Sequence, residues 1–458
     1  MISRWIRRGL RLSPAGIDII VDGIPMDQPS YFSNTGANLG RLTKIRLDGV
    51  LLIGGIGDLF GTDILLPVLQ DLEVRNSALG YIVSDTLTNL TVVYDSPAST
   101  QTYEMFGHIA APRLASLRFE LPLARLANLD FTVEELPCLA QASIRLLHET
   151  PQPWSWDDDD DDDDDEPDTT RPVISNLCTL LGFLCNVTSL HLSGFQEMAR
   201  THAVLLQAVL DEPCCVFPNL KSLVLDDCNL GDGLQTLWRF LHNTPALERL
   251  ALRSCKPWAP HQDPLDNVLL REAIGDLFGT DSLLPVLQDL EIRNSALGYI
   301  ASDTLTNLTV VYDSPVSNPT YEMFGHIAAP GLASLRFEFP LARLANLNFT
   351  MEELPCLAKA SIRLLDETPQ PWSWEDDNDD EPDTTRPVIT DICGILGFLC
   401  NATSLHLHGF QEVARTHAVL LQAVLDEPCV FPDLKSLVLD DCNLGNGLQT
   451  LWRLLPCP

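Results

Sequence analysis

The chain has 458 residues, of which 45% are hydrophobic and 20% are charged, and its formal net charge is -34. A chain of this length exceeds one ordinary compact domain, so it contains either several domains or an array of repeats. Phosphate binding requires clustered Lys and Arg, and here 29 of them face 63 Asp and Glu. The composition therefore argues against nucleic acid as a partner and favours basic proteins.

Cysteine usage and hydropathy limit the cellular setting. The 13 cysteines include no CxxC pair, so buried free thiols are expected rather than a zinc or redox site. No apolar run approaches the roughly 18 to 20 residues of a membrane span, and no secretory signal is recognisable. The first 11 residues are basic enough to resemble a mitochondrial presequence, but a location in the cytoplasm or nucleus, with no membrane partner, fits best.

Short segments with the spacing Leu-x-x-Leu-x-Leu, several followed by a buried Asn, Cys or Ser, recur along the chain. The two Leu of Leu-x-Leu point to the same side of a strand, and neighbouring units stack them into one core. This predicts an α/β leucine-rich-repeat solenoid, with a curved parallel sheet on the concave face and helices and irregular turns on the convex face. In chain order the segments are residues 42–47, 69–79, 87–92, 114–119, 220–230, 247–255 and 434–444. Residues 200–210 have helical spacing and suit the convex layer.

A tandem duplication accounts for the length of the chain. Residues 57–63 recur as residues 275–281, and the match continues at a constant offset of 218. The offset falls to 215 after an acidic stretch and to 214 after Cys214 and Cys215. Such changes in length cost little in loops.

The duplication predicts three parts. The first leucine-rich-repeat region occupies residues 1–256, a proline-rich linker occupies 257–268, and the second region occupies 269–458. The second region stops before any equivalent of residues 243–255, so we expect it to be truncated at its C-terminus, without its last strand and cap.

An acidic insert interrupts each region. Residues 157–165 are nine consecutive aspartates, and like charges at this density cannot share a core. We therefore predict a disordered acidic loop at residues 155–170 and its shorter counterpart at residues 373–384. The alternative reading of the insert is a tether for a basic partner such as a histone tail.

No motif for catalysis, a cofactor or a metal stands out. The chain lacks a nucleophile elbow, an HExxH helix and a dinucleotide fingerprint, and no pair of carboxylates is singled out for acid-base work. His406 and His408 share one face of a strand but have no third ligand at strand spacing. We therefore expect no enzyme, no cofactor and no metal.

The candidate binding residues are those that point outward between the leucines of each strand. Mixed charge with arginine anchors suits a protein interface. The predicted concave-face positions are Asp71, Glu73, Arg75, Arg118, Glu120, Arg145, His191, Asp226, Arg249 and Arg253.

Several motifs resemble those of plant F-box proteins with leucine-rich repeats, and the likeness covers nearly the whole chain. They are Arg-Trp-Ile-Arg-Arg-Gly-Leu-Arg at residues 4–11, Ser-Asp-Thr-Leu-Thr-Asn-Leu at 84–90, Ala-Pro-Arg-Leu-Ala-Ser-Leu at 111–117, Leu-Gly-Asp-Gly-Leu-Gln-Thr-Leu-Trp at 230–238 and Asn-Thr-Pro-Ala-Leu-Glu at 243–248. The resemblance implies repeats that present a substrate to a cullin-based ubiquitin ligase, with an F-box docked on the Skp adaptor. In that family the Arg-Trp-Ile-Arg-like segment follows the F-box, whereas here it begins at Arg4. We therefore expect the F-box to be missing, and Skp binding only if an F-box is encoded upstream.

The sequence thus favours a non-enzymatic protein-binding scaffold that resembles the substrate-recognition repeats of F-box proteins. Two alternatives remain open. One is an acidic, chaperone-like binder of basic proteins that works through the poly-Asp loop, and the other is an inactive duplicated fragment.

Overall fold

The computed structural model describes residues 12–20, 40–49, 66–77, 80–95, 105–126, 129–147, 170–196, 205–210, 216–230, 235–255, 285–295, 299–313, 323–340, 347–365, 385–410, 412–413, 418–419 and 431–443. The chain divides into two compact units. The first comprises Met1–Leu223 with Asp227–Asn229, and the second comprises Val224–Asp226 with Leu230–Pro458.

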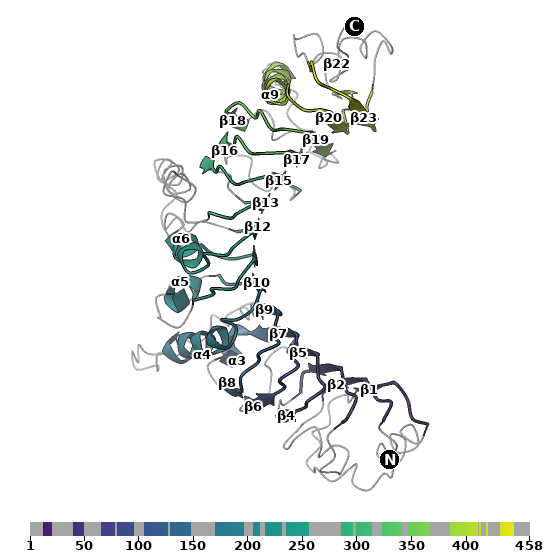
Figure 1. Ribbon diagram of the computed structural model, residues 1–458, viewed down its shortest axis with the longest axis vertical. Helices are drawn as coiled ribbons and strands as arrows, with labels where there is room; N and C mark the ends of the chain where they lie inside the picture. Colours follow the sequence, from purple (N-terminus) through teal and green to yellow (C-terminus); the bar gives the residue numbers. More distant parts are fainter. Residues whose placement is uncertain are drawn as a thin grey trace, which may run out of the picture. The chain divides into compact units, whose positions relative to one another are not determined.

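A parallel sheet, here called the main sheet, runs through the first unit (Figure 1). Each strand pairs in parallel with the next in the order β1-β2-β3-β5-β7-β9-β10. The strands are β1 (Gly16–Ile20), β2 (Lys44–Asp48), β3 (Asp71–Arg75), β5 (Asn89–Val93), β7 (Ser116–Pro122), β9 (Gln141–Leu147) and β10 (Ser189–Ser193). Strand β11 (Ser222–Asp226) lies where the two units meet in the sequence.

The second unit has a main sheet of the same kind, in the parallel order β12-β13-β15-β17-β19-β20-β23. Its strands are β12 (Arg249–Arg253), β13 (Asp289–Arg293), β15 (Asn307–Val311), β17 (Ser334–Pro340), β19 (Lys359–Leu365), β20 (Ser404–His408) and β23 (Ser436–Asp440). Each unit is therefore an α/β, solenoid-like array of parallel strands.

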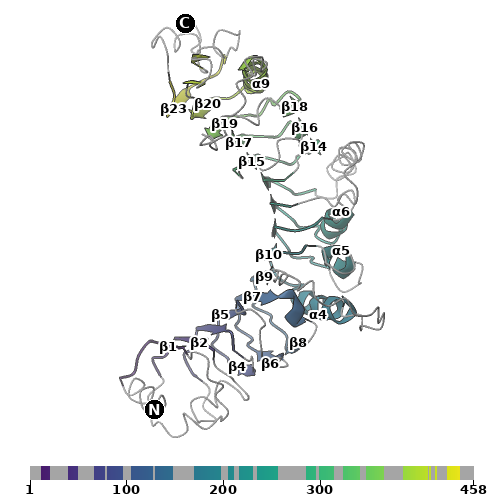
Figure 2. The same cartoon turned by 180° about the vertical axis from the view of Figure 1, so that it is seen from behind.

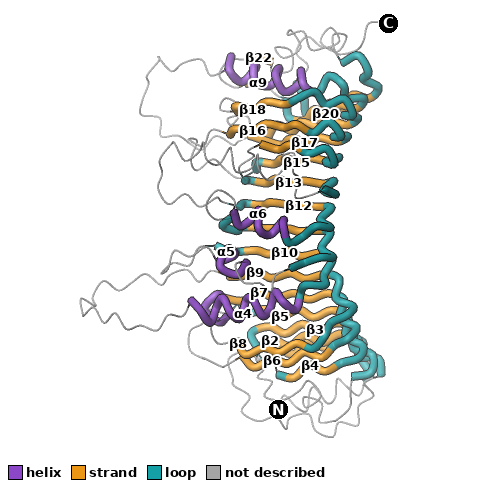
Figure 3. The backbone as a smooth tube through the Cα atoms, turned by 60° about the vertical axis from the view of Figure 1, so that its left-hand side comes forward, coloured by secondary structure: helices purple, strands orange, loops and turns teal. Residues whose placement is uncertain are grey.

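A second layer covers one side of the main sheet in each unit (Figures 2 and 3). Its helices are α3 (Leu123–Leu126), α4 (Thr170–Phe183), α5 (Leu205–Leu210), α6 (Gln235–His242) and α9 (Thr385–Phe398). Two short parallel sheets also belong to this layer: β4 (Tyr81–Val83), β6 (Met105–Ala110) and β8 (Leu129–Val133) in the first unit, and β14 (Tyr299–Ala301), β16 (Met323–Ala328) and β18 (Leu347–Met351) in the second. These short sheets stand where the sequence predicted only helices and irregular turns. The second unit also contains an antiparallel pair, β21 (Glu412–Val413) and β22 (Ala418–Val419).

The hydrophobic core lies between the two layers. On β3, Leu72 and Val74 are buried, whereas the residues on either side of them are partly exposed. This alternation places every second side chain in the core, and each buried Leu or Val contributes roughly 1.5 to 3 kcal/mol of transfer free energy. Helix α4 buries Val173, Leu177 and Leu181, which are four residues apart and so lie on one face of the helix.

Most strands of the main sheets leave the sheet through a left-handed turn, where the residue after the strand is described. The residue directly after the strand has a φ between 44° and 77° in eight cases, namely Gly49, Asn76, Gly194, Asp227, Ser254, Asn294, Gly409 and Asp441. Gly, Asn and Asp adopt this conformation at the lowest cost, which explains the residue types at seven of these positions. Ser254 is the exception.

Side chains in or beside one strand of a main sheet bond main-chain oxygens in or beside the preceding strand. The hydroxyl of Thr88 donates to the carbonyl oxygen of Gln70 at 3.0 Å. The Cys228 thiol donates to the Leu192 carbonyl oxygen at 3.6 Å, and the Cys255 thiol donates to the Leu225 carbonyl oxygen at 3.3 Å. The two thiol bonds satisfy buried main-chain oxygens.

Some predicted segments fall outside the described residues. These are the linker at residues 257–268 and the acidic loops at 155–170 and 373–384, except that Thr170 begins α4. Of the helix expected at residues 200–210, Leu205–Leu210 forms α5. Among the described residues, no helix is long and apolar enough to cross a membrane.

A candidate protein-binding face

The side chains that point away from the second layer form what we call the open face of each main sheet. In the first unit the strand register aligns these side chains in three rows across the strands from β2 to β10. The first row is Lys44, Asp71, Asn89, Ser116, Gln141 and Ser189; the second is Arg46, Glu73, Thr91, Arg118, Ser143 and His191; the third is Asp48, Arg75, Val93, Glu120, Arg145 and Ser193.

The open face of the second unit has the same three rows across the strands from β12 to β23. The first is Arg249, Asp289, Asn307, Ser334, Lys359, Ser404 and Ser436; the second is Ala251, Glu291, Thr309, Arg336, Ser361, His406 and Val438; the third is Arg253, Arg293, Val311, Glu338, Arg363, His408 and Asp440. Both faces are therefore mainly polar, with a few apolar positions.

All ten residues predicted from the sequence stand at outward positions of strands of the main sheets. Arg118, Arg145 and Arg249 are exposed, and the other seven are partly exposed. They are Asp71, Glu73 and Arg75 on β3, Arg118 and Glu120 on β7, Arg145 on β9, His191 on β10, Asp226 on β11, and Arg249 and Arg253 on β12. Their role in binding stays a prediction.

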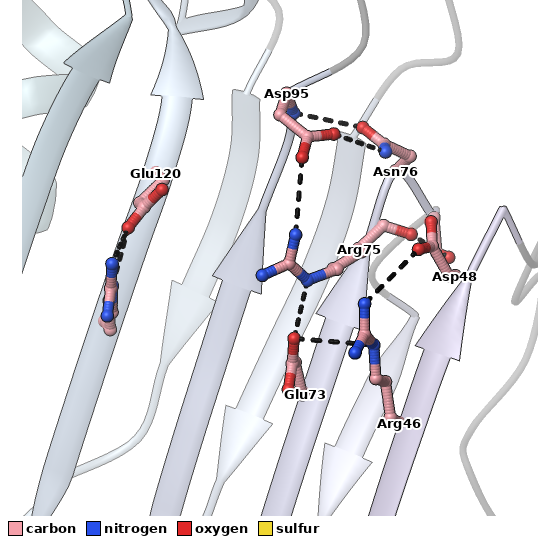
Figure 4. Close-up of polar contacts among 9 residues, drawn as sticks. Arg46, Asp48, Glu73, Arg75, Asn76, Asp95 and Glu120 are labelled. Atoms are coloured by element: carbon pink, nitrogen blue, oxygen red, sulfur yellow. Dashed lines mark hydrogen bonds and ion pairs between the residues drawn. The ribbon is translucent and has the colours of Figure 1, made fainter. Parts of the chain in front are cut away.

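Charged residues of β2 and β3 form a connected network on the open face (Figure 4). Arg46 lies between Asp48, at 3.9 Å, and Glu73, at 3.6 Å. Arg75 bonds Glu73 at 2.5 Å and reaches Asp95 at 3.3 Å. The hydrogen bond that Arg75 Nε donates to Glu73 is the main cause of the raised pKa of Arg75, which stays protonated. Each such partly exposed pair is worth only about 0.2 to 1 kcal/mol, so the network orients side chains more than it stabilises the fold.

Three members of this network were not among the predicted residues. Arg46 and Asp48 flank the buried Leu47, and the alternation rule applied to residues 42–47 would have identified Arg46. Asp95 follows the end of β5, and its Oδ1 accepts a hydrogen bond from Asn76 Nδ2 at 2.6 Å. No sequence signal places Asp95 beside Arg75, because their contact depends on the register of β3 and β5.

Arginine and glutamate also pair along single strands. Arg118 bonds Glu120 on β7, and Arg336 bonds Glu338 on β17. The Arg118 side chain is 56% exposed, whereas that of Glu120 is 12% exposed. The glutamate is thus sheltered by its neighbours, and the guanidinium remains accessible to a partner.

The second unit has further ion pairs on its open face. Arg253 donates two hydrogen bonds to Glu291, from Nε at 2.9 Å and from Nη2 at 3.1 Å. This forked geometry is the strongest form of an arginine-carboxylate pair, and the bonds to Glu291 are the main cause of the raised pKa of Arg253. Arg293 Nη2 lies 3.1 Å from Asp313, and His408 Nδ1 lies 3.0 Å from Asp440.

Not every predicted residue is brought into contact with another. Arg145 and Arg249 are exposed and form no ion pair with any described residue. An unpaired arginine can give its full charge to a partner, whereas a paired one must first leave its carboxylate. Within the described part of the chain, no group of three His, Cys, Asp or Glu side chains could hold a metal ion.

The chemistry of the open face is compatible with protein recognition. The face offers donors, acceptors and charges of both signs, and it includes arginine, which is enriched in interfaces.

Comparison with known proteins gives one clear likeness. No family model matches the chain. The chain is 31% identical over 258 residues to the meiotic F-box protein MOF of rice (Oryza sativa subsp. japonica), and the match covers 55% of this chain and 50% of the rice protein. The chain spans about half the length of the curated relative that it matches, and over that half it is similar to an F-box protein.

Proposed function

We propose that this chain is a non-enzymatic protein-binding scaffold that serves as the substrate-recognition part of an F-box-type ubiquitin ligase. The observation that carries the proposal is the open face, where rows of polar side chains stand on a sheet whose inward side chains are buried. The likeness to a rice F-box protein supports the ligase context. A cytoplasmic or nuclear location fits this role.

We further propose that the solenoid consists of leucine-rich repeats and arose by tandem duplication. In support, contacts of the first unit recur in the second at the same offset of 218. The Tyr94 hydroxyl donates to the Ser77 carbonyl oxygen, and the Tyr312 hydroxyl donates to that of Ser295. The left-handed turn residues Asn76, Gly194 and Asp227 recur as Asn294, Gly409 and Asp441. The bond from the Cys228 thiol to the Leu192 carbonyl oxygen recurs between Cys442 and Leu407.

A capture experiment tests the proposal. The chain is used as bait in plant extract, and the variant Arg118→Glu/Arg145→Glu is compared with Arg113→Glu. Arg113 is exposed in the turn before β7 and does not belong to the open face, so its variant is a control for a single charge reversal away from that face. We expect the double variant to lose a protein that the wild type and the control both retain. Equal recovery with all three baits would count against the open face as the binding surface.

The ligase context has a separate test. The 5′ end of the native transcript is sequenced, and the encoded protein is tested for co-purification with the Skp adaptor. An in-frame F-box with adaptor binding would support the ligase role. Substrate capture without an F-box or adaptor binding would restrict the proposal to a scaffold.

A further inference from the structure

The open faces of the two units are almost identical where their strands correspond. Strands β3, β5, β7, β9, β10 and β11 correspond to β13, β15, β17, β19, β20 and β23, and the outward residues of these strands differ at only two positions. Gln141 is replaced by Lys359, and Ser193 by His408. Both changes bring a basic group to neighbouring strands of the second unit, β19 and β20.

Lys359 and Arg363 are two cations on this part of the sheet, where the neighbouring Arg336 is paired with Glu338. Both are exposed on β19, and neither forms an ion pair with a described residue. The register places Ser334 and Ser404 beside Lys359, so no carboxylate stands next to it in its row.

The acidic groups near Arg363 are already engaged. Its neighbour in the row, Glu338, is bonded by Arg336, and its other neighbour, His408, is bonded to Asp440. The chain as a whole carries a net charge of -34, so a local excess of positive charge on this part of the face is unusual.

We propose that the open face of β19 and β20 docks an acidic segment of a partner protein, with Lys359 and Arg363 as its two cationic anchors. The inference rests on the proposed function and specifies the chemistry of the ligand. Lys359 and Arg363 are separated by four residues along a strand, which is roughly 13 Å between their Cα atoms. Two carboxylates in an extended peptide match this separation better than a single phosphate does.

The outward serines beside Lys359 suit the same ligand. Ser334 and Ser404 flank Lys359, and Ser361 lies between Lys359 and Arg363 on β19. These serines offer neutral hydrogen-bond donors to carboxylate oxygens. In the first unit the residue equivalent to Lys359 is Gln141, which leaves Arg145 as a single anchor. Lys359 therefore distinguishes the ligand preference of the second unit from that of the first.

Fluorescence anisotropy with the full chain tests the proposal. The probes are a labelled 12-residue peptide of alternating Glu and Ser, its Gln counterpart, and a Gln counterpart with one phosphoserine. We expect the Glu peptide to bind at least roughly tenfold more tightly than the Gln peptide, and salt to weaken its binding. K359Q, which restores the residue of the first unit, should weaken it about threefold, and K359Q/R363Q about tenfold. R113Q should change nothing, and Gln141→Lys should add a second site.

Four results would overturn the proposal. Two concern the peptides: equal binding of the Glu and Gln peptides, or tighter binding of the phosphoserine peptide than of the Glu peptide. Two concern the chain: unchanged binding by K359Q/R363Q, or binding that appears only after Asp376, Asp377, Asp379 and Asp380 are changed to Asn. The last result would mean that the chain's own acidic residues 375–381 occupy the open face in place of a partner. Capture that depends on Arg118 and Arg145 tests the proposed function separately, so its persistence alongside a failed peptide experiment would contradict only this inference.

Discussion

Gly194, directly after β10, lies so close to the main-chain carbonyl oxygen of Leu146 on β9 that a Cβ at this position would overlap it. Its φ of 75° is also one that side chains disfavour. The second unit repeats the relationship between Gly409 and Leu364. At these points the chain can leave the main sheet only through glycine.

Replacing Gly194 with alanine should therefore destabilise the protein by roughly 2 to 4 kcal/mol, because the left-handed conformation costs about 1 kcal/mol and the overlap about 1 to 3 kcal/mol. Urea unfolding followed by circular dichroism measures the change. Gly182→Ala is the matched control, since nothing lies within 4 Å of a Cβ at Gly182 in α4, and a gain of roughly 0.5 to 1 kcal/mol is expected there. Equal stability of the two variants would contradict this account.

The buried Tyr94 should make stability depend on alkaline pH. Burial raises the pKa of Tyr94 well above its ordinary value near 10, so the folded state favours the neutral phenol. The resulting stabilisation is complete below the unfolded pKa of about 10 and is lost as the pH rises above it. Tyr94→Phe should cost about 1 kcal/mol at pH 7, because the hydrogen bond to the Ser77 carbonyl oxygen is lost.

Unfolding of the wild type and Tyr94→Phe between pH 8 and about 11 checks this prediction. The difference in free energy of unfolding between the two proteins should shrink above about pH 10. A difference that stays constant across this range would show that Tyr94 ionises as freely in the folded protein as in the unfolded chain.

Thiol reactivity should follow burial. Cys138 and Cys356 are exposed, whereas Cys228 and Cys255 are buried and donate to main-chain oxygens. Brief alkylation of the native protein, mapped by mass spectrometry, should label the exposed pair and spare the buried pair until denaturant is added. Rapid native labelling of Cys228 would mean that the strands around it open readily.

The pair formed by Arg253 and Glu291 should contribute little to stability despite its geometry. Its side chains are about one third exposed, so a double-mutant cycle with Arg253→Gln and Glu291→Gln should give a coupling energy of about 0.2 to 1 kcal/mol that falls in 1 M salt. Arg249→Gln serves as the unpaired control. A coupling above about 3 kcal/mol would mean that the pair is effectively buried.

The strands of the main sheets could be predicted from the sequence because their signal is local. At residues 114–119, for example, the leucine spacing fixes which side chains enter the core, and β7 has Leu117 and Phe119 buried and Arg118 exposed, as predicted. Each outward residue follows from this alternation alone. The strand β9 was also anticipated through its outward residue Arg145.

The second layer could not be predicted in the same way. Residues 81–83 and 105–110 lack the leucine spacing, and their strands β4 and β6 form only because each pairs with a neighbour distant in sequence. The ion pairs of the open face were missed for a related reason. Which carboxylate reaches which arginine depends on register and side-chain direction, as the contact between Arg75 and Asp95 shows.

Position-specific photo-crosslinking tests the central claim, that the open face binds a protein, most directly. A photoreactive residue is placed at Ser116 or Ser143 on the open face. In the second layer it is placed at Thr132 of β8 or at Glu134 directly after that strand, both of which are exposed. We predict that the open-face positions crosslink one discrete partner protein and that the second-layer positions do not. Crosslinks to the same partner from Thr132 and Glu134, with none from Ser116 or Ser143, would contradict the claim.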